Sequence, residues 1–132
     1  MIGILLVTHG ALGEALVQNV CHVLNRRPPL LAQLGIAAQD DPLDVLPLAE
    51  RLLAQVDAGD GVLVMADIYG ATPANVAAKL LLPGKVEGVA GVSLPMLLRA
   101  LTYRDRGMET MVARALSGAR DGALNMLKDV SC

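Results

Sequence analysis

Two residues of this 132-residue chain, His9 and Asp67, have side chains and positions that suit group-transfer chemistry. His9 follows the apolar run Ile2–Thr8 and precedes Gly10, where a helical pattern begins. Asp67 follows another apolar run, Val62–Ala66. A carboxylate that accepts the proton of one imidazole nitrogen leaves a lone pair on the other nitrogen. The pair therefore suits a nucleophilic histidine and its orienting aspartate.

The residues next to these two side chains are of a kind that binds phosphate. Gly10 lets the backbone turn into a helix whose first N–H groups point toward His9, and helix N-termini favour anions. After Asp67, the residues Gly70, Ala71 and Thr72 open a second predicted helix, for which we expect Thr72 to be the cap. The sequence therefore predicts a phosphoryl group on His9, bound by Gly10, Gly70, Ala71 and Thr72.

Apolar runs and helical patterns alternate along the whole chain in the order β-α-β-α-β-α-β-α-α. Continuous apolar runs are typical of strands buried on both faces, and a 3.6-residue period is typical of helices. The expected strands are Ile2–Thr8, Leu30–Ile36, Val62–Ala66 and Val86–Val92. The first expected helix runs from Gly10 to Asn25 and has a buried face of Leu12, Leu16, Val20 and Val23. The second begins at Asp40-Asp41-Pro42 and continues through Val56. The other expected helices are Thr72–Leu81, Pro95–Tyr103 and Met108–Leu127.

This order predicts one α/β domain over residues 1–132, with an open, mostly parallel sheet of strand order 2-1-3-4 and helices on both faces. Such sheets bind ligands beyond the carboxyl ends of their strands, where the strand order reverses. Strands one and three are neighbours at that reversal. The fold therefore predicts that His9 and Asp67 lie close together.

Composition and missing motifs exclude several classes of function. The net charge is -2 and no basic run occurs, so a nucleic-acid-binding surface is not predicted. No phosphate loop for ATP and no dinucleotide fingerprint is found, so no cofactor is expected. Cys21 and Cys132 have no spacing that suits a metal, and two free thiols are typical of the cytosol. No secretion signal or membrane span is predicted, and we expect a soluble, cytoplasmic protein.

The chain resembles the mannose-family IIA domains of the bacterial phosphoenolpyruvate-dependent sugar phosphotransferase system (PTS) over nearly its whole length. The resemblance rests on Gly3-Ile4-Leu5-Leu6-Val7-Thr8-His9-Gly10, on Val64-Met65-Ala66-Asp67-Ile68-Tyr69-Gly70-Ala71-Thr72-Pro73-Ala74-Asn75, and on Ala90-Gly91-Val92-Ser93-Leu94-Pro95-Met96-Leu97. It implies that His9 accepts a phosphoryl group on Nε2 from the phosphocarrier HPr, that Asp67 holds the other side of the ring, and that the group passes to a IIB domain.

Other readings of the same residues remain open. One alternative is a regulatory module of an incomplete phosphotransferase system. Another is the phosphocarrier subunit of dihydroxyacetone kinase. A histidine phosphatase would need an arginine before His9, where Thr8 stands, and a response-regulator receiver domain would need acidic residues there. We expect the IIB acceptor to be a separate protein, and any contact with a membrane to run through transporter subunits.

The family resemblance also implies a homodimer with an exchanged C-terminal segment. The high apolar content of 54% supports dimerisation, since a monomer of this size would expose apolar patches. An apolar stripe of Ala119, Ala123, Leu124 and Leu127 follows the last predicted strand. We therefore expect the region of the C-terminal helix to contribute to the interface.

Overall fold

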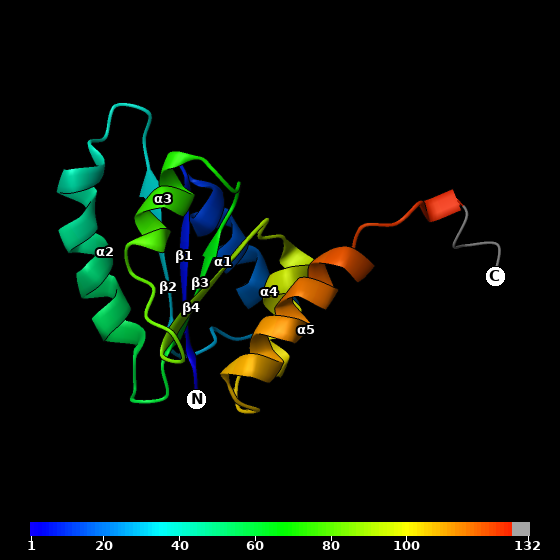
Figure 1. Ribbon diagram of the computed structural model, residues 1–132. Helices are drawn as coiled ribbons and strands as arrows, with labels where there is room; N and C mark the ends of the chain where they lie inside the picture. Colours follow the sequence, from blue (N-terminus) through cyan, green and yellow to red (C-terminus); the bar gives the residue numbers. More distant parts are fainter. Residues whose placement is uncertain (128–132) are drawn as a thin grey trace.

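The computed structural model describes residues 1–127 and contains one four-stranded sheet (Figure 1). Its strands are β1 (Gly3–His9), β2 (Leu31–Ile36), β3 (Val62–Ala66) and β4 (Val86–Ala90). The strand order is β2-β1-β3-β4, and all three neighbouring pairs are parallel. The predicted α/β class and strand order are confirmed, and the sheet is parallel throughout.

In residues 1–127, the helices α1 to α5 cover the two faces of this sheet (Figure 1). The helices α1 (Leu12–Leu24), α4 (Leu94–Thr102) and α5 (Met108–Asp121) pack on one face, while α2 (Pro42–Val56) and α3 (Thr72–Ala78) pack on the other. The Asp41 side chain caps α2 by accepting from the N–H of Leu43 at 2.9 Å, and Pro42 begins the helix as predicted. Within residues 1–127, no helix is long and apolar enough to cross a membrane.

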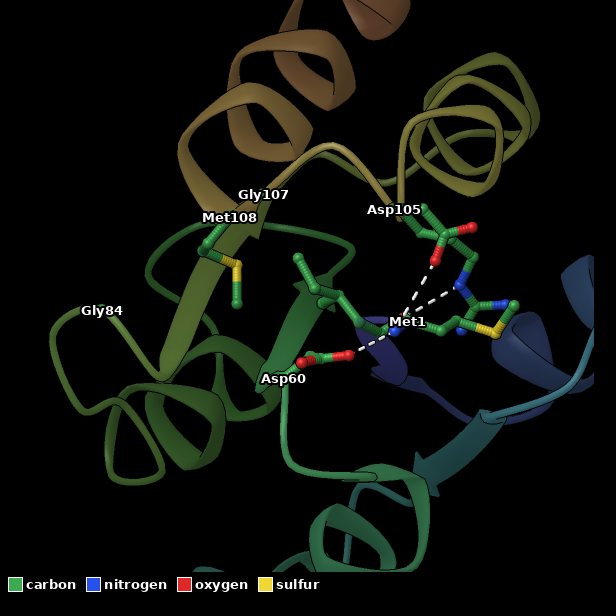
Figure 2. Close-up of a pocket in the computed structure, with 8 residues that line it drawn as sticks. Met1, Asp60, Gly84, Asp105, Gly107 and Met108 are labelled. Atoms are coloured by element: carbon green, nitrogen blue, oxygen red, sulfur yellow. Dashed lines mark hydrogen bonds and ion pairs between the residues drawn. The ribbon is translucent and has the colours of Figure 1, made fainter.

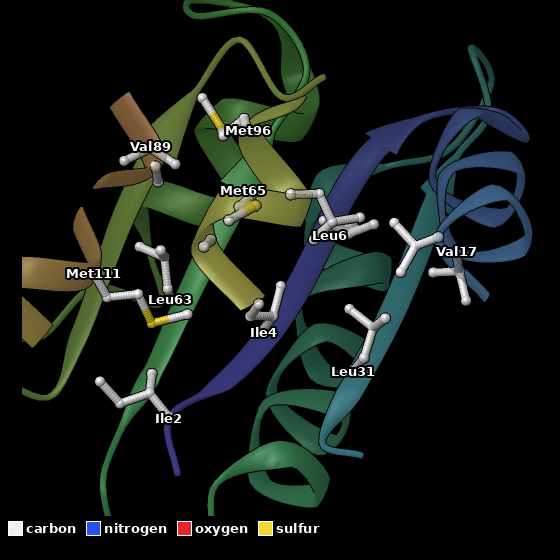
Figure 3. Close-up of a cluster of buried hydrophobic side chains, with 14 residues drawn as sticks. Ile2, Ile4, Leu6, Val17, Leu31, Leu63, Met65, Val89, Met96 and Met111 are labelled. Carbon is white, nitrogen blue, oxygen red and sulfur yellow. The ribbon is translucent and has the colours of Figure 1, made fainter. Parts of the chain in front are cut away.

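The larger part of the core lies between the sheet and the layer of α1, α4 and α5 (Figure 3). The chain has no Phe or Trp, so aliphatic side chains and methionines fill this space. Met65 of β3, Met96 of α4 and Met111 of α5 are fully buried there beside Ile4 and Leu6 of β1. Methionine has three rotatable bonds and fills irregular gaps, which suits a core without aromatic rings. The result is a rigid support beneath β1 and β3.

The predicted ends of two helices were wrong. Helix α3 ends at Ala78 rather than Leu81, because the next amides bond to carbonyls three residues back, as in the tightened last turn of a helix. Helix α5 ends at Asp121 rather than Leu127, since Gly122 follows and glycine is a weak helix former. The predicted stripe over residues 119–127 is therefore not one helical face.

The predicted buried face of α1 was only partly right. Val20 is fully buried and Leu16 packs against the core as predicted, but Leu12 and Val23 are exposed, and Gly13 and Val17 are buried in their place. The face is rotated by about one residue because Gly13, which has no side chain, lets the first turn approach the end of β1 closely.

A cavity of about 310 Å³ lies at the amino ends of the strands, away from His9 (Figure 2). There the amino group of Met1 pairs with Asp60 and, at 3.6 Å, with Asp105. The buried guanidinium of Arg104 donates to the carbonyl oxygens of Ile2, Pro29 and Leu30 at 2.7 to 2.9 Å. These contacts join β1, β2 and the α4–α5 loop at this edge.

Candidate phosphoryl-transfer site

The pairing of β1 with β3 positions the two chemical groups of the site. Val7 pairs with Ala66 in the parallel register, so that His9 and Asp67 follow at adjoining strand ends. His9 is the last residue of β1, and Asp67 is the first residue after β3. Both strands are almost completely buried up to this point, which holds their ends in place. The structure thus brings together the two residues that the sequence predicted to be neighbours.

Two hydrogen bonds hold the Asp67 carboxylate against His9, and a third links it to Ile68. Its Oδ2 atom accepts from the backbone N–H of His9 at 2.9 Å and lies 2.8 Å from Nδ1 of the ring. Its Oδ1 atom accepts from the N–H of Ile68 at 3.0 Å. The Asp67 side chain is only 7% exposed, whereas that of His9 is 51% exposed. The carboxylate therefore supports the ring from inside the protein, and the outer part of the ring faces solvent.

The protonation state of Asp67 determines which ring nitrogen of His9 carries the hydrogen atom. Burial alone would raise the pKa of Asp67, but the hydrogen bonds from His9 and Ile68 outweigh that effect and lower this pKa below its ordinary value. Asp67 is therefore a carboxylate near neutral pH, and a carboxylate only accepts hydrogen bonds. In a neutral His9 ring, Nδ1 then carries the proton, which leaves the lone pair on Nε2.

Close packing of glycines shapes the turn from β1 into α1. Gly10 has a φ of 51°, in the left-handed region that favours glycine, and its N–H donates to the carbonyl of Ile36 at 2.9 Å. Gly35 of β2 lies directly against the Gly10 carbonyl, where a Cβ would overlap the oxygen. The buried hydroxyl of Thr8 accepts from the N–H of Gly13 at 2.8 Å. This turn directs the start of α1 toward the histidine.

The supporting roles of Thr8, Gly13 and Gly35 were not predicted from the sequence. A glycine within a strand pattern often marks a close approach of another backbone, and Gly35 is such a case. That signal was present in the sequence, but it does not say which backbone approaches. The hydrogen bond of Thr8 depends on how α1 packs and has no comparable sequence signal.

The predicted phosphate-binding residues lie in the turns that follow β1 and β3. Gly70, with a φ of 87°, and Ala71 lead into α3. The expectation that Thr72 caps this helix was wrong: Ala71 is the N-cap residue, no side chain caps the helix, and Thr72 is its first residue. The helix begins one residue early because proline is favoured in a first turn, and here Pro73 is the second residue. Within residues 1–127, the Thr72 hydroxyl has no hydrogen-bond partner.

An apolar groove of about 260 Å³ adjoins this second turn. Its lining includes Tyr69, Gly70 and Asn75, Leu81 beyond the end of α3, and Gly88 of β4. The groove therefore lies between α3 and β4, which is an edge strand of the sheet.

No group of three or more His, Cys, Asp and Glu side chains that could hold a metal ion occurs in residues 1–127. Cys21 is a free, partly buried thiol on α1. Cys132 lies outside the described residues.

Comparison with known proteins identifies the family. The EIIA-man model, described as "PTS system fructose IIA component", matches residues 3–116. The chain belongs to this mannose-type IIA family of the phosphotransferase system. Its curated relatives include the PTS mannose-specific EIIAB components of Escherichia coli strain K12 and of Shigella flexneri, each 27% identical over 124 residues. This IIA chain aligns over 92% of its own length but spans only 38% of those relatives.

Solved structures of PTS IIA proteins share the fold. The EIIA component from Streptococcus agalactiae superposes with a TM-score of 0.85 at 21% identity, covering 97% of this chain and 99% of that one. The mannose/sorbose-specific IIA subunit from Enterococcus faecalis gives a TM-score of 0.82 at 22% identity, covering 94% and 93%. The mannose-type IIA fold expected from the resemblance is thereby confirmed.

Proposed function

We propose that this IIA domain is a phosphoryl carrier that accepts a phosphoryl group on His9 from phospho-HPr and passes it to a IIB partner during carbohydrate uptake or its regulation. The observation that carries the proposal is the 2.8 Å contact between Nδ1 of His9 and the Asp67 carboxylate. This contact supports a ring orientation in which Nε2 has the lone pair that accepts the phosphoryl group. Membership of the family supports the same role.

The transfer step requires only the two imidazoles and the phosphoryl group. The Nε2 lone pair of His9 forms the new N–P bond, and the N–P bond to the donor histidine breaks, with its electron pair returning to the donor ring. The His9 ring gains positive charge as the bond forms. Asp67 stabilises that charge through the Nδ1 proton, which stays on the ring. Transfer to the acceptor repeats the same exchange in the other direction.

Backbone amides and a hydroxyl supply the proposed contacts to the phosphoryl oxygens. The turn at Gly10 leads into the first amides of α1, and the turn at Gly70 and Ala71 leads into the first amides of α3. Amides of a first helical turn lack partners within their own helix, although the Gly13 amide of α1 already donates to Thr8. The Thr72 hydroxyl, which is not used as a cap, adds a further donor. These groups are fixed before the reaction, so they stabilise the transferring group with little rearrangement.

The proposal requires neither a metal ion nor a nucleotide, and it places the protein in the cytoplasm with its donor. We expect transfer from phospho-HPr to continue in EDTA. Loss of transfer in EDTA, with recovery on addition of magnesium, would favour a receiver-like mechanism instead.

Incubation with HPr, enzyme I and phosphoenolpyruvate, followed by intact-mass measurement, tests the proposal. We expect a mass increase of one phosphoryl group, and loss of that group when a cognate IIB protein is added. A phosphorylated chain that no IIB protein can discharge would favour the regulatory reading. An unphosphorylated chain would reject the carrier role.

A further inference from the structure

The hydroxyl of Thr8 is a buried polar group in an otherwise apolar row of β1. Ile4 and Leu6 of this strand point into the core that the sheet shares with α1, α4 and α5 (Figure 3). Side chains alternate between the two faces of a strand, so Thr8 occupies the next position of the row, where it is completely buried. A valine would have nearly the same shape, whereas a buried hydroxyl costs stability unless it is hydrogen-bonded. Packing alone therefore does not account for the hydroxyl.

The partner of this hydroxyl lies in the first turn of α1. Thr8 Oγ1 accepts from the N–H of Gly13, the second residue of the helix, at 2.8 Å. Ala11 is the N-cap residue of α1 and has no side chain that caps the helix. An N-cap side chain ordinarily accepts from this same amide or from the next one. Thr8 thus caps α1 from the end of the strand, and the loop between them contains His9.

The absence of a side chain at Gly13 makes this contact possible. A Cβ at this position would lie 2.9 Å from the hydroxyl oxygen of Thr8 and 3.3 Å from the Cβ atom of Gln33 on β2. The start of α1 is therefore held closely against the ends of β1 and β2. This packing and the hydrogen bond together fix the position of the first turn relative to His9.

The same hydrogen bond determines which amides of the first turn remain available. The N–H groups of Leu12, Gly13 and Glu14 precede the first hydrogen bond within α1. Thr8 takes that of Gly13, and within residues 1–127 the other two have no hydrogen-bond partner. The amides of Leu12 and Glu14 are therefore the ones that α1 can offer to a phosphoryl group on His9.

We propose that Thr8 is a positioning residue for phosphoryl transfer. Its hydroxyl holds the first turn of α1 so that the N–H groups of Leu12 and Glu14 meet the phosphoryl oxygens on His9. Without the hydroxyl, the Gly13 amide loses its acceptor and the turn shifts, which weakens the contacts to the phosphorylated ring. This inference rests on the proposed carrier function and names the residue that aligns one of its two sets of amides.

Removal of the hydroxyl at nearly constant shape tests the inference. Thr8→Val removes it and Thr8→Ser keeps it. For each variant, the equilibrium ratio of phosphorylated IIA chain to phospho-HPr is measured after removal of enzyme I and phosphoenolpyruvate, together with kcat and KM for phospho-HPr. We expect Thr8→Val to lower the ratio and kcat about tenfold with little change in KM, since a hydrogen bond to a charged group is worth roughly that factor. Thr8→Ser should recover most of the loss.

Val20→Ala is the matched control for a loss of stability in the same helix. Val20 is completely buried in α1, about two turns beyond Gly13. The control should lower the free energy of unfolding at least as much as Thr8→Val does, while its phosphoryl ratio stays at the wild-type value. Equal falls of the ratio in the two variants would mean that stability rather than positioning carries the effect, and would overturn the inference.

Gly13→Ala tests the same contact from the helix side, and it remains informative if Thr8→Val does not fold. The added Cβ pushes the first turn away from the Thr8 hydroxyl, so the ratio and kcat should fall as in Thr8→Val. The double variant should lose less than the product of the two single effects, because both substitutions remove one contact. Fully multiplicative effects would show that the two residues act separately and would contradict the inference.

The outcomes separate this inference from the carrier function. If phospho-HPr phosphorylates the wild type, and Thr8→Val keeps the wild-type ratio and kcat, Thr8 is only a structural residue and the carrier function stands. If phospho-HPr does not phosphorylate the wild type, the carrier function fails and the positioning role of Thr8 fails with it.

Discussion

At the scale of single residues, the central feature is the contact between the buried carboxylate of Asp67 and the exposed ring of His9. We expect Asp67→Asn to leave the fold intact and to slow phosphoryl transfer roughly a hundredfold. An amide oxygen can still accept the Nδ1 proton, but it lacks the charge that stabilises the ring as it becomes cationic. Rapid-quench kinetics with phospho-HPr measures the rate, and circular dichroism checks the fold.

The control for this substitution is Glu50→Gln, which removes an exposed carboxylate on α2 away from His9. It should transfer at the wild-type rate. Wild-type kinetics in Asp67→Asn would instead mean that Asp67 only holds its loop, through its hydrogen bond with Ile68.

The lowered pKa of Asp67 also predicts how stability depends on pH. Because this pKa lies below 3.8 in the folded chain, the ionised carboxylate stabilises the protein fully at pH values above the ordinary aspartate pKa. That contribution is lost as the pH falls through the folded-state pKa. Urea unfolding across the acid range should therefore show the wild type losing stability more steeply than Asp67→Asn. Parallel curves for the two proteins would contradict the pKa shift.

At the scale of the elements, the turn between β1 and α1 depends on how closely β2 approaches it. A Cβ at Gly35 would overlap the carbonyl oxygen of Gly10, and a backbone atom cannot swing aside. We expect Gly35→Ala to lower the free energy of unfolding by about 1–3 kcal/mol and to slow transfer by displacing the turn beside His9. Urea titration and transfer kinetics measure the two effects.

A second strand glycine provides the matched control for this substitution. A Cβ at Gly88 in β4 would lie 2.9 Å from the end of the Leu81 side chain, which can rotate away. Gly88→Ala should therefore cost less stability than Gly35→Ala and leave transfer unchanged. Equal losses of stability in both variants would show that the overlap with the Gly10 carbonyl is not what makes Gly35→Ala costly.

Sequence patterns predicted the elements that position His9 and Asp67 because those elements are buried strands. The apolar run of β1 ends next to His9, and that of β3 ends next to Asp67. The ends of both strands could therefore be located to within a residue. Helix ends were less predictable. The end of α3 and the capping of its first turn depend on local competition for hydrogen bonds, which periodicity does not report. The buried face of α1 depended on Gly13, which an apolar pattern overlooks.

At the scale of the whole molecule, the exposed apolar groups near the C-terminus predict a homodimer. Leu124, Met126 and Leu127 are 57%, 76% and 85% exposed, and this segment extends away from the body of the domain (Figure 1). The apolar groove between α3 and the edge strand β4 is open on the same molecule. Burial of such surfaces between two copies would stabilise a symmetric assembly. Light scattering at micromolar concentration should give the mass of a dimer.

A monomeric mass would reject this interface. Deletion of residues 128–132, which lie outside the described residues, tests how much of the C-terminus is needed. A dimer that survives the deletion would keep the interface but reject an essential role for the last residues.

The account as a whole depends on His9 being the phosphorylated residue, and the chain offers a built-in control because His22 is its other histidine. His9→Ala and His22→Ala are each incubated with HPr, enzyme I and phosphoenolpyruvate, and their intact masses are measured. The account predicts that His22→Ala gains one phosphoryl group, which is labile in acid and stable in alkali, and that His9→Ala gains none. Unchanged phosphorylation of His9→Ala would contradict it.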